Sequence, residues 1–198
     1  MINEAVRFLT DEVNKYLSLK LGVTTDDRLV AGNIARAFDG DSGGVTNALS
    51  NKAIVSLINI EEDRISKLQE PYVKVDNRIV YKNPAIPVNM YLLFAANLTK
   101  YDESLTLLSY IIRFFQNQFV FTSATHPTLD PQIGKLITDI YTLSFEQVNH
   151  LWGTLGGKYL PSILYKVRLV TIDEGLPYAA GEFITEIDIE NKLKAPLL

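Results

Sequence analysis

The segment at residues 88–98, VNMYLLFAANL, constrains the fold most, because both of its alternating faces are largely apolar. A strand with this pattern has to be covered on both sides, so it predicts the centre of a sheet that carries helices on its faces. The same segment is the most apolar stretch of the chain. It is far shorter than the roughly 18 apolar residues of a membrane span, so we expect no contact with a membrane.

Three segments have the periodicity of amphipathic helices, at residues 3–20, 101–116 and 145–155. Their apolar residues recur at steps of three and four. Ser144 and Gln147 form a capping box that opens the third helix. The stripe that we expect to be buried on the second helix consists of Tyr101, Leu105, Leu108, Ile112 and Phe115. The apolar face expected on the third helix consists of Phe145, Val148, Leu151, Trp152 and Leu155.

The other patterned segments predict strands. They are residues 29–37, 53–60, 135–143, 162–173 and 183–189, a short strand around Phe119 and Phe121, and a hairpin formed by 72–75 and 78–82. Gly32, inside the first of these segments, predicts a bulge or a close approach of the backbone. Several strands follow one another without an intervening helix, which favours antiparallel pairing.

This order of elements predicts the α+β class, as a single domain with a central, mostly antiparallel (mixed) sheet and about three flanking helices. Residues 1–174 are expected to form that domain. Residues 175–198 are expected to be a C-terminal tail that serves as an edge strand or as an arm that binds a partner, because the tail is too apolar for a free solvated end. Its interface candidates are Phe183, Ile184, Ile187 and Ile189.

A long polar loop at residues 39–51 is the second region in which we expect contacts. Glycine and aspartate suit its turns, and a polar loop of this length is able to become ordered when it docks on a partner. The interface candidates in the loop are Asp39, Asp41 and Asn47.

The composition excludes several classes of protein. The 198 residues include no cysteine, so the chain has no disulfide scaffold, cysteine-ligated zinc finger or thiol nucleophile. The formal net charge of -4 argues against a protein that coats nucleic acid, which needs a basic surface. Charged residues interrupt any apolar run near the N-terminus, so we expect no secretory leader. We expect neither a cofactor nor a bound metal.

The segment at residues 40–44, GDSGG, matches the loop around the nucleophile of trypsin-like serine proteases. That chemistry needs a histidine base in contact with the serine. The two histidines, His126 and His150, lie far downstream, whereas the protease family has its histidine upstream of the serine. We therefore interpret the segment as a flexible turn.

A cluster of carboxylates at the end of one predicted strand consists of Glu61, Glu62 and Asp63. Paired carboxylates are able to act as acid and base or to bind a divalent cation. The cluster therefore leaves open a small metal-dependent hydrolase as an alternative function. The simpler interpretation is a solvated strand end beside Arg64.

Several segments of the chain resemble the cap, or tail-terminator, family of phage-tail-like contractile injection systems. The opening MINEAVRFLTDEVNKYL is similar to that family's first helix, and residues 32–34 and 59–64 are similar to its first two strand motifs. Residues 90–97 are similar to its central strand. The most specific match is LSFEQVNHLWGTLGGKYLPSILYKVRLVTID at residues 143–173. The resemblance covers roughly residues 1–174.

The resemblance implies a structural protein with neither catalysis nor a cofactor. In that family, subunits form a ring, typically a homohexamer, that ends the inner tube and anchors the last layer of sheath. The implied partners are further copies of the chain, the inner tube protein and the sheath protein, and a second cap protein is left open because some family members carry a further C-terminal domain. The implied location is the bacterial cytoplasm during assembly and then the particle, with release from the cell left open. A tail-completion or baseplate component is the alternative within this class.

Overall fold

The structure is a computed structural model that describes residues 1–22, 27–38, 48–64, 72–75, 78–83, 85–156, 158–172 and 177–182. Contacts within the chain divide it into two units. The first unit comprises Met1–Ser66 and Ile86–Ile172, and the second comprises Lys67–Ala85 and Asp173–Leu198.

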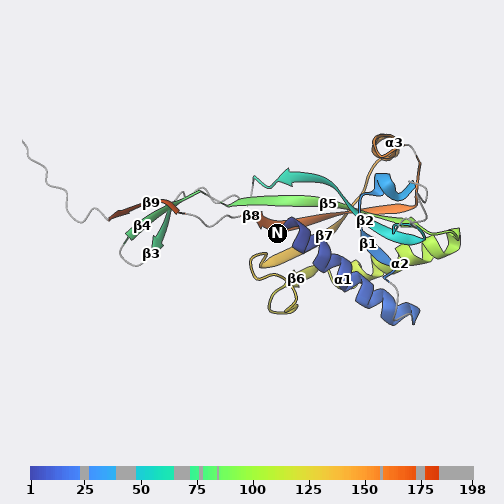
Figure 1. Cartoon of the computed structure of the whole chain (residues 1–198), viewed down its shortest axis with the longest axis horizontal. Helices are drawn as coiled ribbons and strands as arrows, with labels where there is room; N and C mark the ends of the chain where they lie inside the picture. The colour runs from blue at the N-terminus through green and yellow to red at the C-terminus, as the bar shows by residue number, and fades with distance from the viewer. Residues whose placement is uncertain are drawn as a thin grey trace, which may run out of the picture. The chain divides into compact units, whose positions relative to one another are not determined.

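A six-stranded mixed sheet forms the centre of the first unit (Figure 1). Its strands are β1 (Leu29–Ala31), β2 (Lys52–Glu62), β5 (Ile86–Asn97), β6 (Val120–Thr122), β7 (Lys135–Tyr141) and β8 (Ser162–Ile172). They lie in the order β1-β2-β5-β8-β7-β6. The pair of β1 and β2 is parallel, and the other neighbours are antiparallel. The predicted central strand is confirmed, because β5 lies between β2 and β8.

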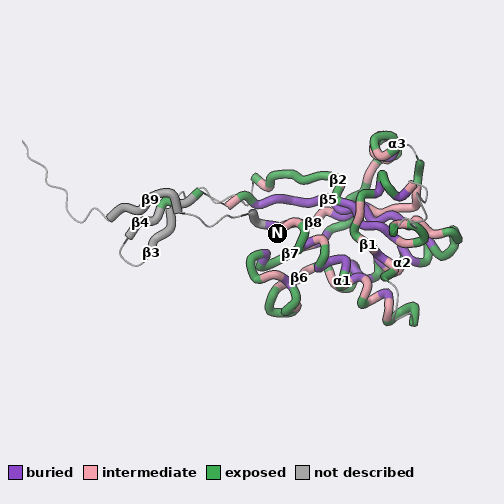
Figure 2. Tube along the Cα trace, in the orientation of Figure 1, coloured by how far each residue is buried: buried purple, intermediate pink, exposed green. Residues whose placement is uncertain are grey.

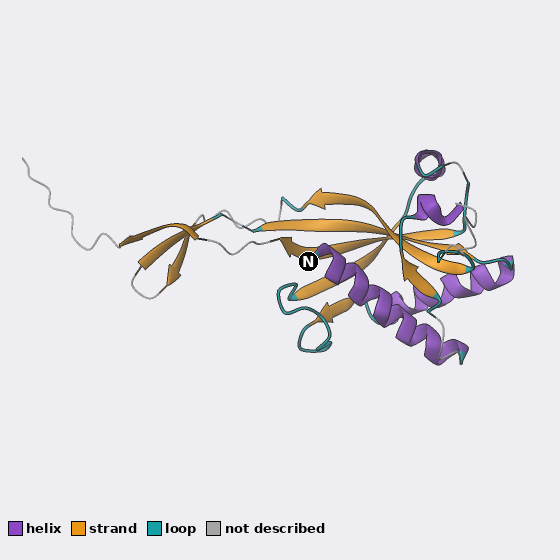
Figure 3. Cartoon of the chain, viewed as in Figure 1, coloured by secondary structure: helices purple, strands orange, loops and turns teal. Residues whose placement is uncertain are grey.

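Helices α1 (Ile2–Leu21) and α2 (Tyr101–Asn117) cover one face of this sheet (Figure 3). The core between the helices and the sheet is centred on Phe94 of β5, which is fully buried. The ring of Phe94 packs edge-on against Phe115 of α2 and Tyr165 of β8, with centroid distances of 5.4 and 5.7 Å. This packing holds α2 and the two central strands together.

A short 3-10 helix, η1 (Ile34–Phe38), and helix α3 (Phe145–Thr154) cover the opposite face of the sheet. Leu93 of β5 and Trp152 of α3 are buried together in this second core. Successive residues of a strand point to opposite faces. Strand β5 is therefore buried on both sides, as Figure 2 shows, and the three layers confirm the predicted α+β class with its three flanking helices.

The predicted buried stripe of α2 is wrong in three of its five positions. Tyr101, Leu105 and Ile112 are 65%, 45% and 41% exposed. The residues that α2 buries are Ser104, Leu107, Leu108, Ile111, Phe114 and Phe115. Apolar side chains occupy more than one row of this helix, so the spacing alone predicted a row beside the one that packs on α1 and the sheet.

The predicted apolar face of α3 is wrong at its first residue. The capping box is confirmed, because Ser144 N–H donates to Gln147 Oε1 at 2.9 Å and Gln147 N–H donates to Ser144 Oγ at 3.2 Å. The side chain of Phe145 is nevertheless 96% exposed, and the one residue that α3 buries is Trp152. The helix therefore docks on the sheet through the turn that carries Trp152.

The strand predicted at residues 29–37 ends at Ala31. The side chain of Ser56 turns the chain here, because its hydroxyl accepts from Ile34 N–H at 2.9 Å and donates to the carbonyl of Gly32. The predicted close approach at Gly32 is confirmed, since a Cβ at this residue would lie 2.7 Å from Leu49 Cδ2. The next residues, Ile34–Phe38, form η1 instead of a strand.

The second unit contains a three-stranded antiparallel sheet in the order β3-β4-β9. Its strands are β3 (Tyr72–Val75), β4 (Arg78–Lys82) and β9 (Pro177–Glu182). The strands of the predicted hairpin are confirmed in β3 and β4. β9 lies within the predicted tail, whereas the strand expected at 183–189 lies outside the described residues. The domain boundary at residue 174 stays a prediction. None of the helices in the described part of the chain is long and apolar enough to cross a membrane.

Candidate functional site

The predicted carboxylate cluster lies at the end of β2, and its side chains do not converge. Glu61 Oε2 accepts hydrogen bonds from the Tyr91 hydroxyl at 2.6 Å and from Lys166 Nζ at 3.2 Å. Glu62 Oε2 lies 3.8 Å from Arg64 Nε. Neighbouring residues of a strand point to opposite faces, which separates Glu61 from Glu62. Within the described ranges, no group of three or more histidine, aspartate and glutamate residues is placed to hold a metal ion.

The surroundings of Glu61 keep it in its charged form. The hydrogen bond from Tyr91 is the largest cause that lowers the pKa of Glu61, followed by the hydrogen bond from Lys166. The same hydrogen bond to Glu61 raises the pKa of the Tyr91 hydroxyl. A carboxylate held in this way accepts hydrogen bonds and is poorly suited to donate a proton. The geometry therefore does not favour the alternative of a metal-dependent hydrolase.

Polar and aromatic side chains cross four strands of the sheet in a row. This row, which we call the charged row, consists of Glu61 of β2, Tyr91 of β5, Lys166 of β8 and Asp139 of β7. Tyr91, Lys166 and Asp139 occupy neighbouring register positions. Lys166 Nζ lies 5.4 Å from the centre of the Tyr91 ring. Arg168 binds Asp139, with 2.7 Å between Nη2 and Oδ2. Tyrosine and arginine are enriched in the contact regions of protein complexes.

A cavity of about 430 Å³ lies between the charged row and α3. Its apolar wall comes from residues of β2, the loop before α3, α3 and β8: Ile58, Leu143, Leu151 and Leu164. Tyr91 and Tyr141 stand at one side with their rings edge to face, 5.1 Å apart. Glu61, Asn59 and Gln147 supply the polar groups. An apolar floor with a few polar groups at its margin is suited to receive a side chain of another protein.

Substitution of Tyr91 by phenylalanine should raise the pKa of Glu61, because it removes the largest cause of the lowering. In the wild-type chain the folded-state pKa lies below the unfolded value. The hydrogen bonds of Glu61 therefore stabilise the fold above the unfolded pKa, and this contribution is lost as the pH falls through the folded pKa. We expect the stability of Tyr91→Phe to vary less with pH than that of the wild type below about pH 4.5.

An NMR titration of the Glu61 carboxyl carbon, combined with urea unfolding at each pH, measures both effects. Tyr141→Phe is the matched control. It leaves the hydrogen bond of Glu61 in place and removes a hydroxyl from the neighbouring ring. An unchanged pKa of Glu61 in Tyr91→Phe would contradict the conclusion that the hydrogen bond from Tyr91 is the main cause of the lowered pKa.

The predicted contact residues of the polar loop and of the tail are not among the described residues. Asp39, Asp41 and Asn47 lie in the undescribed range 39–47, and Phe183, Ile184, Ile187 and Ile189 lie in the undescribed range 183–198. The protease-like segment 40–44 lies there as well. Their roles stay predictions.

Exposed apolar side chains form the part of the surface that sequence reasoning missed. Phe145, Ile140 and Phe119 are 96%, 58% and 54% exposed. All three lie in segments with apolar periodicity, and that periodicity indicated burial for Phe145. No signal in the sequence separates an exposed member of such a pattern from a buried one.

The edges of the sheet are a further candidate surface. β1 pairs with residues 53–55 of β2, so within the described part of the chain the rest of β2 has no partner strand on that side. β6 pairs with residues 135–137 of β7, which leaves the end of β7 open in the same way. Backbone N–H and C=O groups that lack a partner strand at such edges pair readily with a strand of another chain.

A model of the Pvc16 N-terminal domain family matches residues 4–186. The fold is similar to the PVC sheath/tube terminator of an extracellular contractile injection system in its extended state, with 14% identity, a TM-score of 0.58, and coverage of 94% of this chain and 64% of that chain. It is also similar to the anti-feeding prophage cap, a tube terminating cap, with 14% identity, a TM-score of 0.53, and coverage of 94% and 59%. This chain thus spans less than two thirds of either. No curated protein matches it.

Proposed function

Because the chain belongs to the family of Pvc16 N-terminal domains, we propose that it is a structural cap of a contractile injection system. Copies of the chain form a ring that ends the inner tube and anchors the last layer of sheath. The agreement of the fold with two tube terminators over 94% of this chain is the observation that carries the proposal.

The partners in this proposal are further copies of the chain, the inner tube protein and the sheath protein. A ring of six copies is the form that we propose, with assembly in the bacterial cytoplasm and incorporation into the particle. A second cap protein is a further partner in this proposal. A heterologous contact between two different patches is what allows a small protein to close a ring.

The surface of the first unit supports a role in contacts. Among the described residues, the open edges of β2 and β7 and the exposed side chain of Phe145 are features that partner chains commonly cover. Ion pairs join Glu61 to Lys166 and Asp139 to Arg168, and they hold these side chains in a fixed direction across the sheet. Oriented polar groups of this kind give contacts their register.

We also propose the tail and the polar loop as contact segments. Residues 174–198 hold five acidic residues and two lysines, together with the apolar Phe183, Ile184, Ile187 and Ile189. This composition suits a segment that adds a strand to an edge and meets a basic surface. The loop that contains Asp39, Asp41 and Asn47 is the second proposed contact.

Removal of the chain from cells that build the particle should give tubes and sheaths of uncontrolled length or stability, because nothing ends tube growth. Electron microscopy of purified particles measures the distribution of lengths. Production of the full chain with a gold-binding label should restore uniform particles and place the label opposite the baseplate. A chain without residues 183–198 should restore them poorly.

Uniform, stable particles in the absence of the chain would contradict the proposed function. A label at the baseplate end would favour a baseplate component instead. The control is a strain that produces the labelled chain together with the unlabelled one, in which the lengths stay those of the wild type.

A further inference from the structure

Phe145 is the most exposed large apolar side chain among the described residues, with 96% of its surface accessible. It is the first residue of α3, directly after the capping box of Ser144 and Gln147. The cap fixes the backbone at this position, so the ring projects from a defined point. The next residue, Glu146, is also exposed and places a carboxylate beside the ring. Ring and carboxylate together form a short protruding segment.

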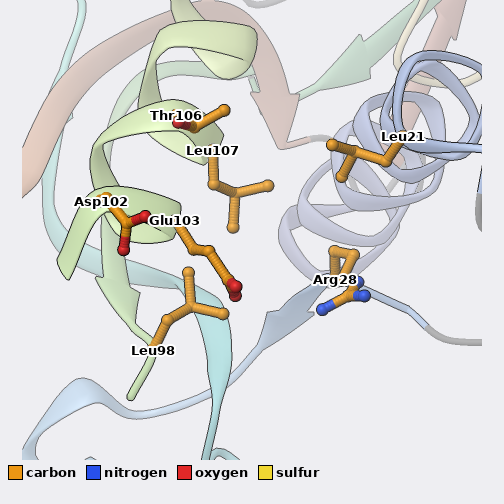
Figure 4. A pocket seen from close by; sticks show the side chains of 7 residues that line it. All are labelled: Leu21, Arg28, Leu98, Asp102, Glu103, Thr106 and Leu107. Carbon is orange, nitrogen blue, oxygen red and sulfur yellow. The ribbon is translucent and has the colours of Figure 1, made fainter. Parts of the chain in front are cut away.

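A pocket of about 260 Å³ lies at the ends of α1 and β5 and the first turns of α2 (Figure 4). Leu21, Leu98 and Leu107 form its apolar walls, and Figure 4 shows Leu21 and Arg28 across from Leu107 and Glu103. An apolar cavity of about 150 Å³ is already large enough for benzene. The pocket is therefore large enough for the ring of a phenylalanine.

Arg28 brings a guanidinium group to the lining of this pocket. Its Nε is buried and has no hydrogen-bond partner among the described residues. Glu103, on the opposite wall, binds Lys100 instead, with 3.0 Å between Oε1 and Nζ. A guanidinium group is stabilised by an aromatic ring beneath it and by a carboxylate at its edge. The protruding segment, with the ring of Phe145 and the carboxylate of Glu146, offers both.

The segment and the pocket lie in different layers of the first unit. α3 lies on one face of the sheet, whereas α1 and α2 lie on the other (Figure 1). The sheet separates Phe145 from the pocket of its own chain. A contact between them joins two copies through different patches. Such a heterologous contact repeats from copy to copy, and it forms a ring when the rotation between copies closes.

We propose that Phe145 of one copy inserts into the pocket lined by Leu21, Leu98 and Leu107 of a second copy, where Glu146 binds Arg28. The occupant of the pocket is thus a second copy of this chain. This inference rests on the proposed ring, since it names the contact that joins neighbouring subunits.

The absence of cysteine from the chain allows a direct test by disulfide cross-linking. Asn149→Cys and Thr106→Cys place single thiols one helical turn after Phe145 and beside the pocket, and both leave Glu146 and Arg28 in place. A chain with both substitutions should give a ladder of disulfide-linked multimers under mild oxidation, both in solution and on particles. An equal mixture of the two single variants should give disulfide-linked dimers and no larger species. Each single variant by itself should give almost no disulfide-linked product.

Phe145→Ser is the second arm of the test. In the chain with both cysteines, it should lower the yield of cross-linked multimers more than about tenfold, as expected for the loss of a central aromatic contact. Phe119→Ser, which removes a different exposed ring, should leave the yield unchanged. Since both rings are exposed, neither substitution should alter the thermal unfolding of the monomer.

Three outcomes would overturn the inference. They are a lack of cross-links on assembled particles, an unchanged yield with Phe145→Ser, and a disulfide within one chain. The position of the labelled chain in particles distinguishes this failure from failure of the proposed function. A chain that caps tubes without this cross-link overturns the contact alone, whereas a cross-linked chain that is absent from tube ends overturns the proposed function.

Discussion

Substitution of Phe94 by alanine should lower the free energy of unfolding of the first unit by about 3–5 kcal/mol, the cost typical of removing a buried aromatic side chain. The ring is fully buried and packs edge to face against Phe115 and Tyr165. Strand partners on both sides fix the backbone of β5 at this point. The surrounding side chains therefore cannot close the cavity, and the loss should lie in the upper part of that range.

Urea unfolding followed by circular dichroism measures this effect, and the midpoint should fall while the dependence of stability on urea stays the same. The matched control is Phe119→Ala, which removes the same side chain where it is 54% exposed. That substitution should cost less than about 1 kcal/mol. Equal losses for the two variants would contradict the assignment of Phe94 to the centre of the core.

The central strand could be predicted from the sequence because burial on both faces leaves a local signature. The apolar run that contains Leu93 and Phe94 matches β5, and the two residues are buried in different cores. The buried row of α2 has no such local signature. Ile111 is fully buried and Ile112 is 41% exposed, although both are equally apolar. The packing of α2 on α1, where Tyr16 meets Phe114 at 5.5 Å, decides between them.

The end of β1 could not be predicted for a similar reason. The turn into η1 depends on Ser56, whose hydroxyl binds the backbone at Gly32 and Ile34. Ser56 lies on the neighbouring strand, 22 residues after Ile34 in the chain. A local pattern covers only a few residues and does not include Ser56. The alternation of apolar residues after Ala31 therefore predicted that the strand continues.

The candidate site shows the same division between local and distant information. The cluster of carboxylates is visible in the sequence, but the groups that bind Glu61 lie 30 and 105 residues away, at Tyr91 and Lys166. Spacing therefore left a metal site open as an alternative to a solvated strand end, whereas the fold places a hydrogen-bonded row there. The family could be identified from longer segments, and the match of a Pvc16 N-terminal domain model to residues 4–186 confirms the predicted cap family.

Substitution of Trp152 by alanine should detach α3 from the sheet and cost about 3–5 kcal/mol. Trp152 is 4% exposed and is the one residue that α3 buries. Its ring also packs edge to face against Tyr159, with 5.6 Å between the centroids. A helix of ten residues is rarely stable in water without tertiary contacts, so the loss of this anchor should also unfold α3.

Hydrogen exchange checks this prediction, because the amide groups of α3 should exchange much faster in Trp152→Ala while those of α1 stay protected. Trp152→Phe is the matched control and should retain most of the protection, since it keeps a ring in the site. Unchanged protection of α3 in the alanine variant would contradict the role of Trp152 as the anchor.

The loss of Trp152 should also affect the proposed contact between copies. Phe145 projects from a fixed position only while α3 is docked, so Trp152→Ala should also lower the cross-linking of copies even though the ring of Phe145 is still present.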